Sequence, residues 1–74
     1  MLTEKNLVAI EYVLLTEDQS YFVEYLLGEL ILSNSISEAM KFDDELVALK
    51  FKTMLYRRCR LTTSVNTYIE IEKV

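Results

Sequence analysis

The 74-residue chain contains no His, no Pro, no Trp, one Gly and one Cys. Without His and with a single thiol, it cannot form a His-based acid–base pair, a Cys–His dyad, a zinc site of Cys and His ligands or an internal disulfide. With 51% hydrophobic residues, the chain is too apolar to be intrinsically disordered. The composition therefore predicts one small folded domain over residues 1–74, which is not an enzyme and needs no cofactor.

Two segments near the start of the chain have the residue pattern of β-strands. Residues 6–15 and 20–27 are rich in β-branched, aromatic and aliphatic side chains, and the polar residues 16–19 favour a hairpin turn between them. The only glycine, Gly28, interrupts an apolar stretch that is too long for one strand of so small a domain. We expect a bend at Gly28, with residues 30–32 either continuing the strand or forming a separate one.

Two helix starts follow. Ser35 and Glu38 have the spacing of a capping box, which predicts a short helix over about 36–41. Asp43 can cap a second helix, and the acidic residues after it are favourable at the positive end of the helix dipole. The spacing of the apolar residues that follow predicts a main helix from there to about Arg57.

The end of the chain predicts one more strand. Residues 60–66 are polar and loop-like, whereas residues 67–74 alternate between polar and apolar side chains. This alternation indicates a closing strand with Ile69 and Ile71 facing the core. The predicted fold is α+β: a small antiparallel sheet, made of a bent hairpin and a C-terminal strand, packed against one short and one long helix.

The charge is distributed unevenly along the chain. The formal net charge is −4, but residues 1–45 hold ten Asp and Glu against two Lys and therefore carry −8, whereas residues 46–74 carry +4. Such asymmetry suggests an acidic surface that faces a basic partner; alternatively, the fold interleaves both signs on one solvated surface. The residues predicted to contact a basic partner are Glu17, Asp18, Glu24, Glu29, Asp43, Asp44 and Glu45.

The acidic clusters offer oxygen ligands, but their spacing argues against a metal or acid–base site, because a tight turn and a helix start explain them better. The basic residues offer an alternative function, contact with nucleic acid, through Lys50, Arg57, Arg58 and Arg60. The −8 charge in the rest of the chain would repel a polyanion, so direct binding of nucleic acid is disfavoured.

Residues 7–15 are mostly apolar on both faces of the predicted strand. A chain of this length has difficulty stabilising itself with one core, and disulfides are excluded, so both observations favour a homodimer. The alternative is that other segments of the same chain cover the second face.

The first residues lack the basic and apolar regions of a secretory leader, and no run approaches the roughly 18 apolar residues of a membrane span. We therefore expect a cytoplasmic protein without a membrane partner.

The stretch 37–51, preceded by a hairpin and followed by one strand, resembles a pattern common in small bacteriophage proteins. In size, acidity and charge asymmetry the chain is similar to phage host-takeover inhibitors, in particular those of staphylococcal phages that act on the bacterial DNA sliding clamp. The resemblance implies a dimer in the host cytoplasm whose acidic surface occupies the basic DNA channel of the clamp, in place of DNA. Anti-CRISPR and anti-restriction proteins of similar DNA-mimic design remain alternatives.

Gln19-Ser20-Tyr21-Phe22 is similar to the clamp-binding peptide, in which Gln precedes hydrophobic anchors. The sequence departs from that pattern because it lacks the leucine and because a strand would bury these residues. The resemblance thus implies contact with the channel rather than with the peptide pocket.

Overall fold

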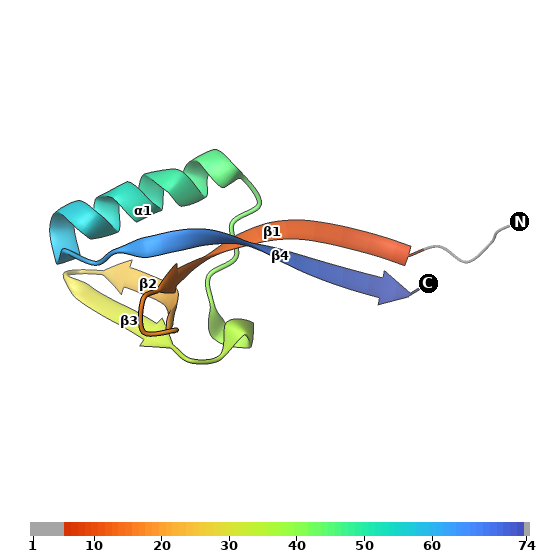
Figure 1. Ribbon diagram of the computed structural model, residues 1–74, viewed down its shortest axis with the longest axis horizontal. Helices are drawn as coiled ribbons and strands as arrows, with labels where there is room; N and C mark the ends of the chain where they lie inside the picture. Colours follow the sequence, from red (N-terminus) through yellow and green to blue (C-terminus); the bar gives the residue numbers. More distant parts are fainter. Residues whose placement is uncertain (1–5, 74) are drawn as a thin grey trace, which may run out of the picture.

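The computed structural model describes the backbone of residues 6–73 and the side chains of residues 9–70. It contains the strands β1 (Asn6–Thr16), β2 (Tyr21–Leu26), β3 (Glu29–Ser33) and β4 (Thr63–Lys73), a 3-10 turn (Ile36–Glu38) and the helix α1 (Glu45–Cys59). The strands form one antiparallel sheet in the order β3-β2-β1-β4 (Figure 1). The α+β class predicted from the sequence is therefore confirmed.

The longest feature of the sheet is the ribbon of β1 and β4. The two strands pair over their whole length, from Asn6 with Lys73 to Thr16 with Thr63. One half of this ribbon carries α1, and the other half projects beyond the body of the molecule (Figure 1). The prediction of a loop over residues 60–66 is wrong beyond Thr62, because β4 begins at Thr63, where pairing with the end of β1 outweighs the polar composition.

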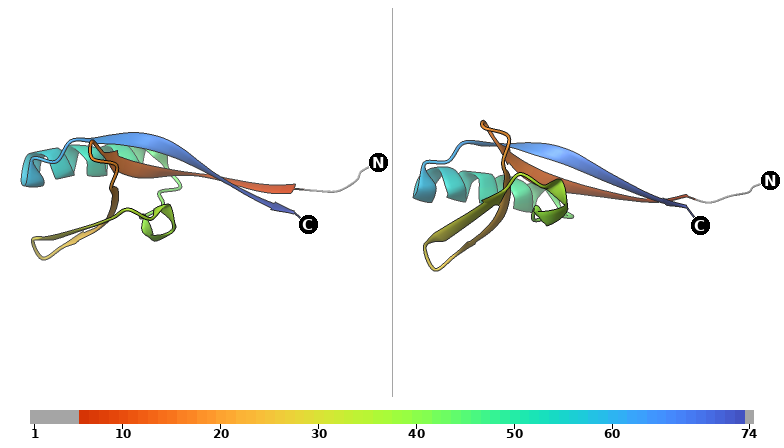
Figure 2. Two further views of the ribbon diagram at one scale, coloured as in Figure 1. Left: turned by 60° about the horizontal axis from the view of Figure 1, so that its bottom comes forward. Right: turned by 90° about the horizontal axis from the view of Figure 1, so that it is seen from below.

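Strand pairing between the β2–β3 hairpin and this ribbon is very short. β1 and β2 share the single register pair Leu15 with Tyr21, so the hairpin swings away from the ribbon (Figure 2). Between its strands lies a tight turn at Leu27 and Gly28. The expected bend at Gly28 is confirmed, and of the two alternatives, the separate short strand is the one observed.

The predicted short helix over 36–41 is wrong, because only one 3-10 turn forms there. The capping box is also absent: the Glu38 carboxylate accepts from the Ser33 hydroxyl, and the side chain of Ser35 makes no capping bond. The chain must be extended after this turn, because the Met40 amide donates to the Phe22 carbonyl at 2.9 Å.

The main helix is confirmed with shifted ends. Asp44, not Asp43, is the N-cap, and its carboxylate accepts from the Leu46 amide at 2.9 Å. The helix ends at Cys59 rather than Arg57, because Arg60 adopts a left-handed conformation with φ 53° and its amide bonds back to the last turn.

The core lies where the hairpin, the ribbon and α1 meet. Its buried side chains come from these elements and from the segment that precedes α1: Leu14, Phe22, Phe42, Ala48 and Leu55. The ring of Phe51 on α1 lies 5.0 Å from that of Phe42 and 6.0 Å from that of Phe22, measured between centroids. These contacts hold the hairpin to the helix.

The chain covers both faces of β1 near its C-terminal end, since Val13 and Leu14 point to opposite faces and both are buried. Farther along the projecting ribbon, the cross-strand pair Ile10 and Ile69 is 53% and 56% exposed. The prediction that Ile69 faces the core is therefore wrong, because this part of the ribbon extends past α1. The side chain of Ile71 lies outside the described residues.

Thr16 and Thr63 pair across β1 and β4, and their hydroxyl groups predict opposite effects of substitution on stability. The Thr16 hydroxyl bonds to Asp18 and accepts from the Ser20 amide, whereas the equally buried Thr63 Oγ1 has no hydrogen-bond partner among the residues that the structure describes. Because a buried unpaired hydroxyl is destabilising, we expect Thr63→Val to raise the free energy of unfolding by about 1 kcal/mol. Thr16→Val should lower it by about 1–2 kcal/mol. Urea titration measures both, and the reverse order would contradict the assignment.

Candidate functional site

The structure distributes the predicted acidic contact residues over three places. Glu17 and Asp18 occupy the β1–β2 turn, Glu24 and Glu29 lie on the hairpin, and the remaining three carboxylates cluster at the start of α1, where Asp44 is used as the helix cap. In the turn, Glu17 and Asp18 line a hollow of about 260 Å³ together with Arg60. The acidic and basic halves of the sequence thus meet at this point, and the seven carboxylates do not form one surface.

The β1–β2 turn is ordered by its own hydrogen bonds. The Thr16 hydroxyl donates to the Asp18 carboxylate, and the Thr16 amide donates to the Ser20 carbonyl at 2.8 Å. The hydrogen bond from Thr16 holds the pKa of Asp18 below its ordinary value of 3.8. Asp18 therefore has a structural role in the turn.

The hairpin presents a mixed apolar and acidic face to solvent. A bulge between Phe22 and Glu24 adds one residue to β2, so that both Phe22 and Tyr25 point to the core. Leu30 and Leu32 on β3 pack on the same inner side. The outward side chains, together with the turn residue that joins the strands, are Glu24, Leu26, Leu27, Glu29 and Ile31, which we call the hairpin face.

On the hairpin face, charge and apolar surface alternate. Glu24 lies opposite Ile31, and Leu26 lies opposite Glu29, so each exposed carboxylate has an exposed aliphatic neighbour across the hairpin. The chain has no Lys or Arg between Asn6 and Met40. Basic residues nearby in sequence therefore do not neutralise the face.

The tip of the hairpin has an unusual residue for its conformation. Leu27 and Gly28 have φ values of 53° and 79°, and positive φ at both positions is typical of a type I′ turn, in which Asn or Asp normally precedes the Gly. A left-handed conformation costs a leucine roughly 1–2 kcal/mol. Leu27 is also 96% exposed, so its side chain gains almost nothing from the fold.

Sequence reasoning missed Leu27 as a candidate contact residue. The signal was present in the chain as the run Leu26-Leu27-Gly28, because an aliphatic residue directly before the glycine of a two-residue hairpin turn violates the usual preference. It was hidden by the apolar stretch around it, in which a leucine is expected to be buried.

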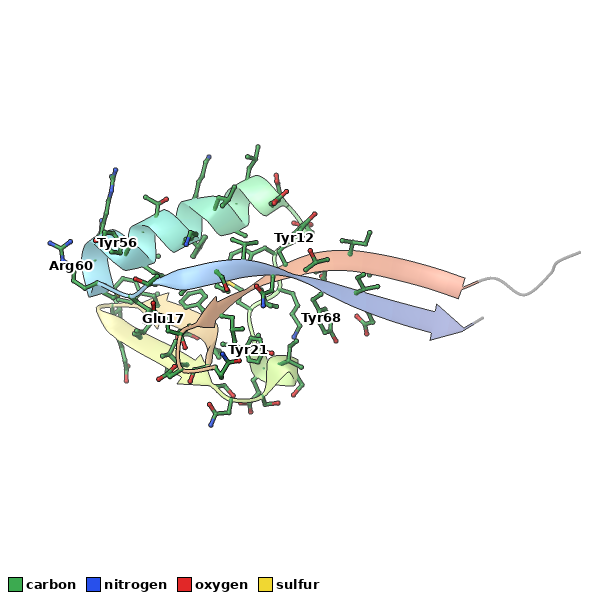
Figure 3. The ribbon with its side chains drawn as sticks, viewed as in Figure 1. Tyr12, Glu17, Tyr21, Tyr56, Arg60 and Tyr68 are labelled. Carbon is green, nitrogen blue, oxygen red and sulfur yellow. The ribbon has the colours of Figure 1, made fainter. Side chains whose placement is uncertain are left out.

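The basic residues of the alternative site lie on α1 and at its C-cap. Lys50, Arg57, Arg58 and Arg60 are all exposed, and the guanidinium of Arg60 lies 5.9 Å from the centre of the Tyr56 ring (Figure 3). A hollow of about 280 Å³ is lined by Tyr56 and Arg57 together with Lys52. Lys52 itself donates to the Thr63 carbonyl, so part of this basic charge is used within the fold.

Other candidate sites receive less support. Phe22 is fully buried, so the peptide-like segment Gln19-Ser20-Tyr21-Phe22 does not present its second aromatic residue to a partner. Within the described part of the chain, no group of three or more Cys, Asp or Glu residues is arranged to hold a metal ion. Among the described residues, no helix has the length and hydrophobicity needed to cross a membrane.

Comparisons of the chain with protein-family models, with curated proteins and with solved structures find no match.

The hydrogen bond of Asp18 predicts a pH effect on stability. Because folding lowers the pKa of Asp18, its contribution is present above the unfolded value of 3.8 and is lost as the pH falls through the folded value. We expect Asp18→Asn to lower the melting temperature at neutral pH and to weaken its decline in acid. Thermal unfolding over a series of pH values tests this, with Glu17→Gln as the control; an unchanged decline in Asp18→Asn would contradict it.

The conformation of Leu27 predicts a stabilising substitution. Asn tolerates positive φ better than Leu, so Leu27→Asn should raise the free energy of unfolding by about 0.5–1 kcal/mol. Leu26→Asn is the matched control, because Leu26 is also exposed but lies in a strand, where Asn is disfavoured. Denaturant titration of both variants is the measurement, and destabilisation by Leu27→Asn would show that the leucine is not strained.

Proposed function

We propose that this chain is a non-enzymatic binding protein whose hairpin face docks on a basic surface of another protein. The observation that supports the proposal most directly is Leu27, which combines a left-handed backbone with a fully exposed aliphatic side chain between two carboxylates. Folding alone gives no reason for a leucine there, because Asn would be more stable in the same turn. A partner that buries the side chain supplies that reason.

The chemistry of the hairpin face defines the surface that would bind it. The exposed side chains of Leu26, Leu27 and Ile31 call for an apolar depression, and Glu24 and Glu29 beside them call for Lys or Arg at its rim. Carboxylates of this kind speed association and select for a basic partner, while the buried aliphatic groups supply most of the affinity.

For the identity of the partner we propose the bacterial DNA sliding clamp, with the chain acting as a phage-encoded inhibitor in the host cytoplasm. This target rests on the resemblance to phage host-takeover inhibitors and on the −8 charge of residues 1–45. In this proposal, the acidic hairpin enters the basic DNA channel of the clamp. A host defence protein, bound in the manner of anti-CRISPR or anti-restriction DNA mimics, is the alternative partner of the same chemistry.

Binding to purified sliding clamp, measured by biolayer interferometry, tests the proposal. We expect Leu27→Asn to weaken binding at least roughly tenfold although it stabilises the fold, since an anchor residue is lost. Glu24→Gln should weaken binding severalfold and reduce its dependence on salt. Glu70→Gln, which removes one exposed carboxylate on the projecting ribbon, is the control and should bind like the unaltered chain.

The outcomes separate the alternatives. If Leu27→Asn binds normally while carboxylates in all three places contribute, the chain acts as a DNA mimic and the mixed contact is wrong. If the unaltered chain does not bind the clamp, the proposed target is wrong. A mobility shift of DNA or RNA that disappears when Arg57, Arg58 and Arg60 are changed to Ala would identify a nucleic-acid-binding module instead.

A further inference from the structure

The outer edge of β4 has no neighbouring strand. The sheet order places β4 at one end, and its 11 residues pair with β1 without a bulge or a proline. Among the described residues, no other element lies beside the half of the ribbon that projects from the body (Figures 1 and 2). A ribbon of two strands is marginally stable by itself, and a long straight edge is a template for a further strand.

The hydrogen bonds of β1 show which backbone groups of β4 point to this edge. The Thr16 amide donates to the Ser20 carbonyl at 2.8 Å, and Tyr12 exchanges two backbone hydrogen bonds with Phe42, at 2.7 and 2.8 Å. Both β1 residues therefore direct backbone groups away from β4, so that their pairs with β4 are of the non-hydrogen-bonded kind. In an antiparallel ladder such pairs alternate with hydrogen-bonded ones, which fixes the pattern along the whole ribbon.

Every second residue of β4 therefore presents its amide and carbonyl to the outer edge. These residues are Thr63, Val65, Thr67, Ile69 and Ile71. The Thr63 carbonyl agrees with this direction, because it accepts from the Lys52 ammonium on α1. Thr67 and Ile69 are exposed, and their outward backbone groups have no hydrogen-bond partner among the residues that the structure describes.

The two faces of the projecting ribbon define the side chains that an added strand needs. One face is apolar and carries the exposed cross-strand pair Ile10 and Ile69. The other face carries Glu11 and the exposed Glu70, which are diagonal neighbours across the two strands. A strand that fits both faces alternates aliphatic residues, placed beside Ile69, with Lys or Arg residues, placed beside Glu70.

The charge of the acidic face favours a basic strand from another protein over a second copy of this chain. Lys41 lies over the Tyr68 ring on this face, but its ammonium donates to the carbonyls of Ile36 and Ala39, at 2.8 and 3.1 Å. It is thus engaged within its own chain. A second copy paired along the same edge would add its own carboxylates to the face, whereas Lys or Arg side chains would neutralise those already there.

We propose that the free edge of β4, from Thr67 to Ile71, receives an antiparallel third strand from a partner protein, in which aliphatic residues alternate with Lys or Arg. The outward amides and carbonyls of β4 bind the main chain of that strand, and Glu70 selects its basic side chains. The site uses no residue of the hairpin face, so the inference does not rest on the proposed function.

Binding of a peptide to the full chain tests this inference. The probe is a short fluorescein-labelled peptide in which Val alternates with Lys, and fluorescence anisotropy measures its affinity. We expect Thr67→Pro to weaken binding at least roughly tenfold, because the proline removes an outward amide. That amide does not pair with β1, so the circular dichroism spectrum should not change. Thr67→Val keeps the amide and is the matched control, which should bind like the unaltered chain.

Methylated peptides test the same hydrogen bonds without altering the protein, and therefore also apply if Thr67→Pro does not fold. In the antiparallel arrangement the Val residues of the probe lie opposite Thr67 and Ile69 and direct their amides to β4, whereas the Lys amides point to solvent. Methylation of the Val amide nitrogens should abolish binding. Methylation of the Lys amide nitrogens leaves the charge equal and should preserve binding.

Any of four results would overturn the proposal. The probe does not bind the unaltered chain. Thr67→Pro and Thr67→Val bind it equally, which would show attraction of charge alone. The two methylated peptides bind alike. Light scattering finds a dimer of the unaltered chain that Thr67→Pro converts to a monomer, which would show that a second copy occupies the edge.

Discussion

The contact among three phenylalanine rings determines how this molecule is arranged. Phe22 belongs to the hairpin, Phe42 to the segment that leads into the helix, and Phe51 to α1, and their rings pack within 6.0 Å of one another in the pairs Phe22–Phe51 and Phe42–Phe51. The sheet alone would not fix the hairpin, because β1 and β2 share a single register pair. The ring contacts, with Tyr25, Leu30 and Leu32 packed on the same core, therefore hold the hairpin where the sheet does not.

The same core contact also determines which side chains of the hairpin and of α1 are exposed to solvent. The aromatic cluster holds the inner side of the hairpin against the core. The bulge in β2 lets both Phe22 and Tyr25 face that core, so Glu24 and Leu26 point outward. Because α1 uses Ala48, Phe51 and Leu55 for the core, Leu46, Leu49 and Tyr56 remain on its far side. One exposed surface is mixed acidic and apolar, and the other is apolar with opposite charges at its two ends.

Much of the fold was predictable from local patterns, and the errors have identifiable physical causes. Strand alternation and turn residues predicted β1, the first turn and the bend at Gly28, since these depend on neighbouring residues. The capping box at Ser35 and Glu38 failed because distant backbone partners, Phe22 for Met40 and Tyr12 for Phe42, require extended chain there. Thr63 reads as a loop residue, yet its pairing with Thr16, far away in sequence, makes it the first residue of β4.

The candidate site was predictable only in part. Charge counting identified an acidic half of the chain, but the sequence could not show that its carboxylates lie in three places or that Arg60 lies beside Glu17 and Asp18. Simple alternation of side chains along β2 also gives the wrong inward-facing residues, because the bulge after Phe22 reverses which side chains face the core. Leu27 became a candidate only when its backbone conformation and exposure were known together.

We propose that the hairpin face is the surface that meets a basic protein. Hydrogen–deuterium exchange of the chain, followed by mass spectrometry with and without purified sliding clamp, tests this contact most directly. We expect slower exchange in the clamp-bound chain over residues 24–31, with little change along the projecting ribbon of β1 and β4. Protection confined to residues 50–60 of α1, with unchanged exchange in the hairpin, would contradict it.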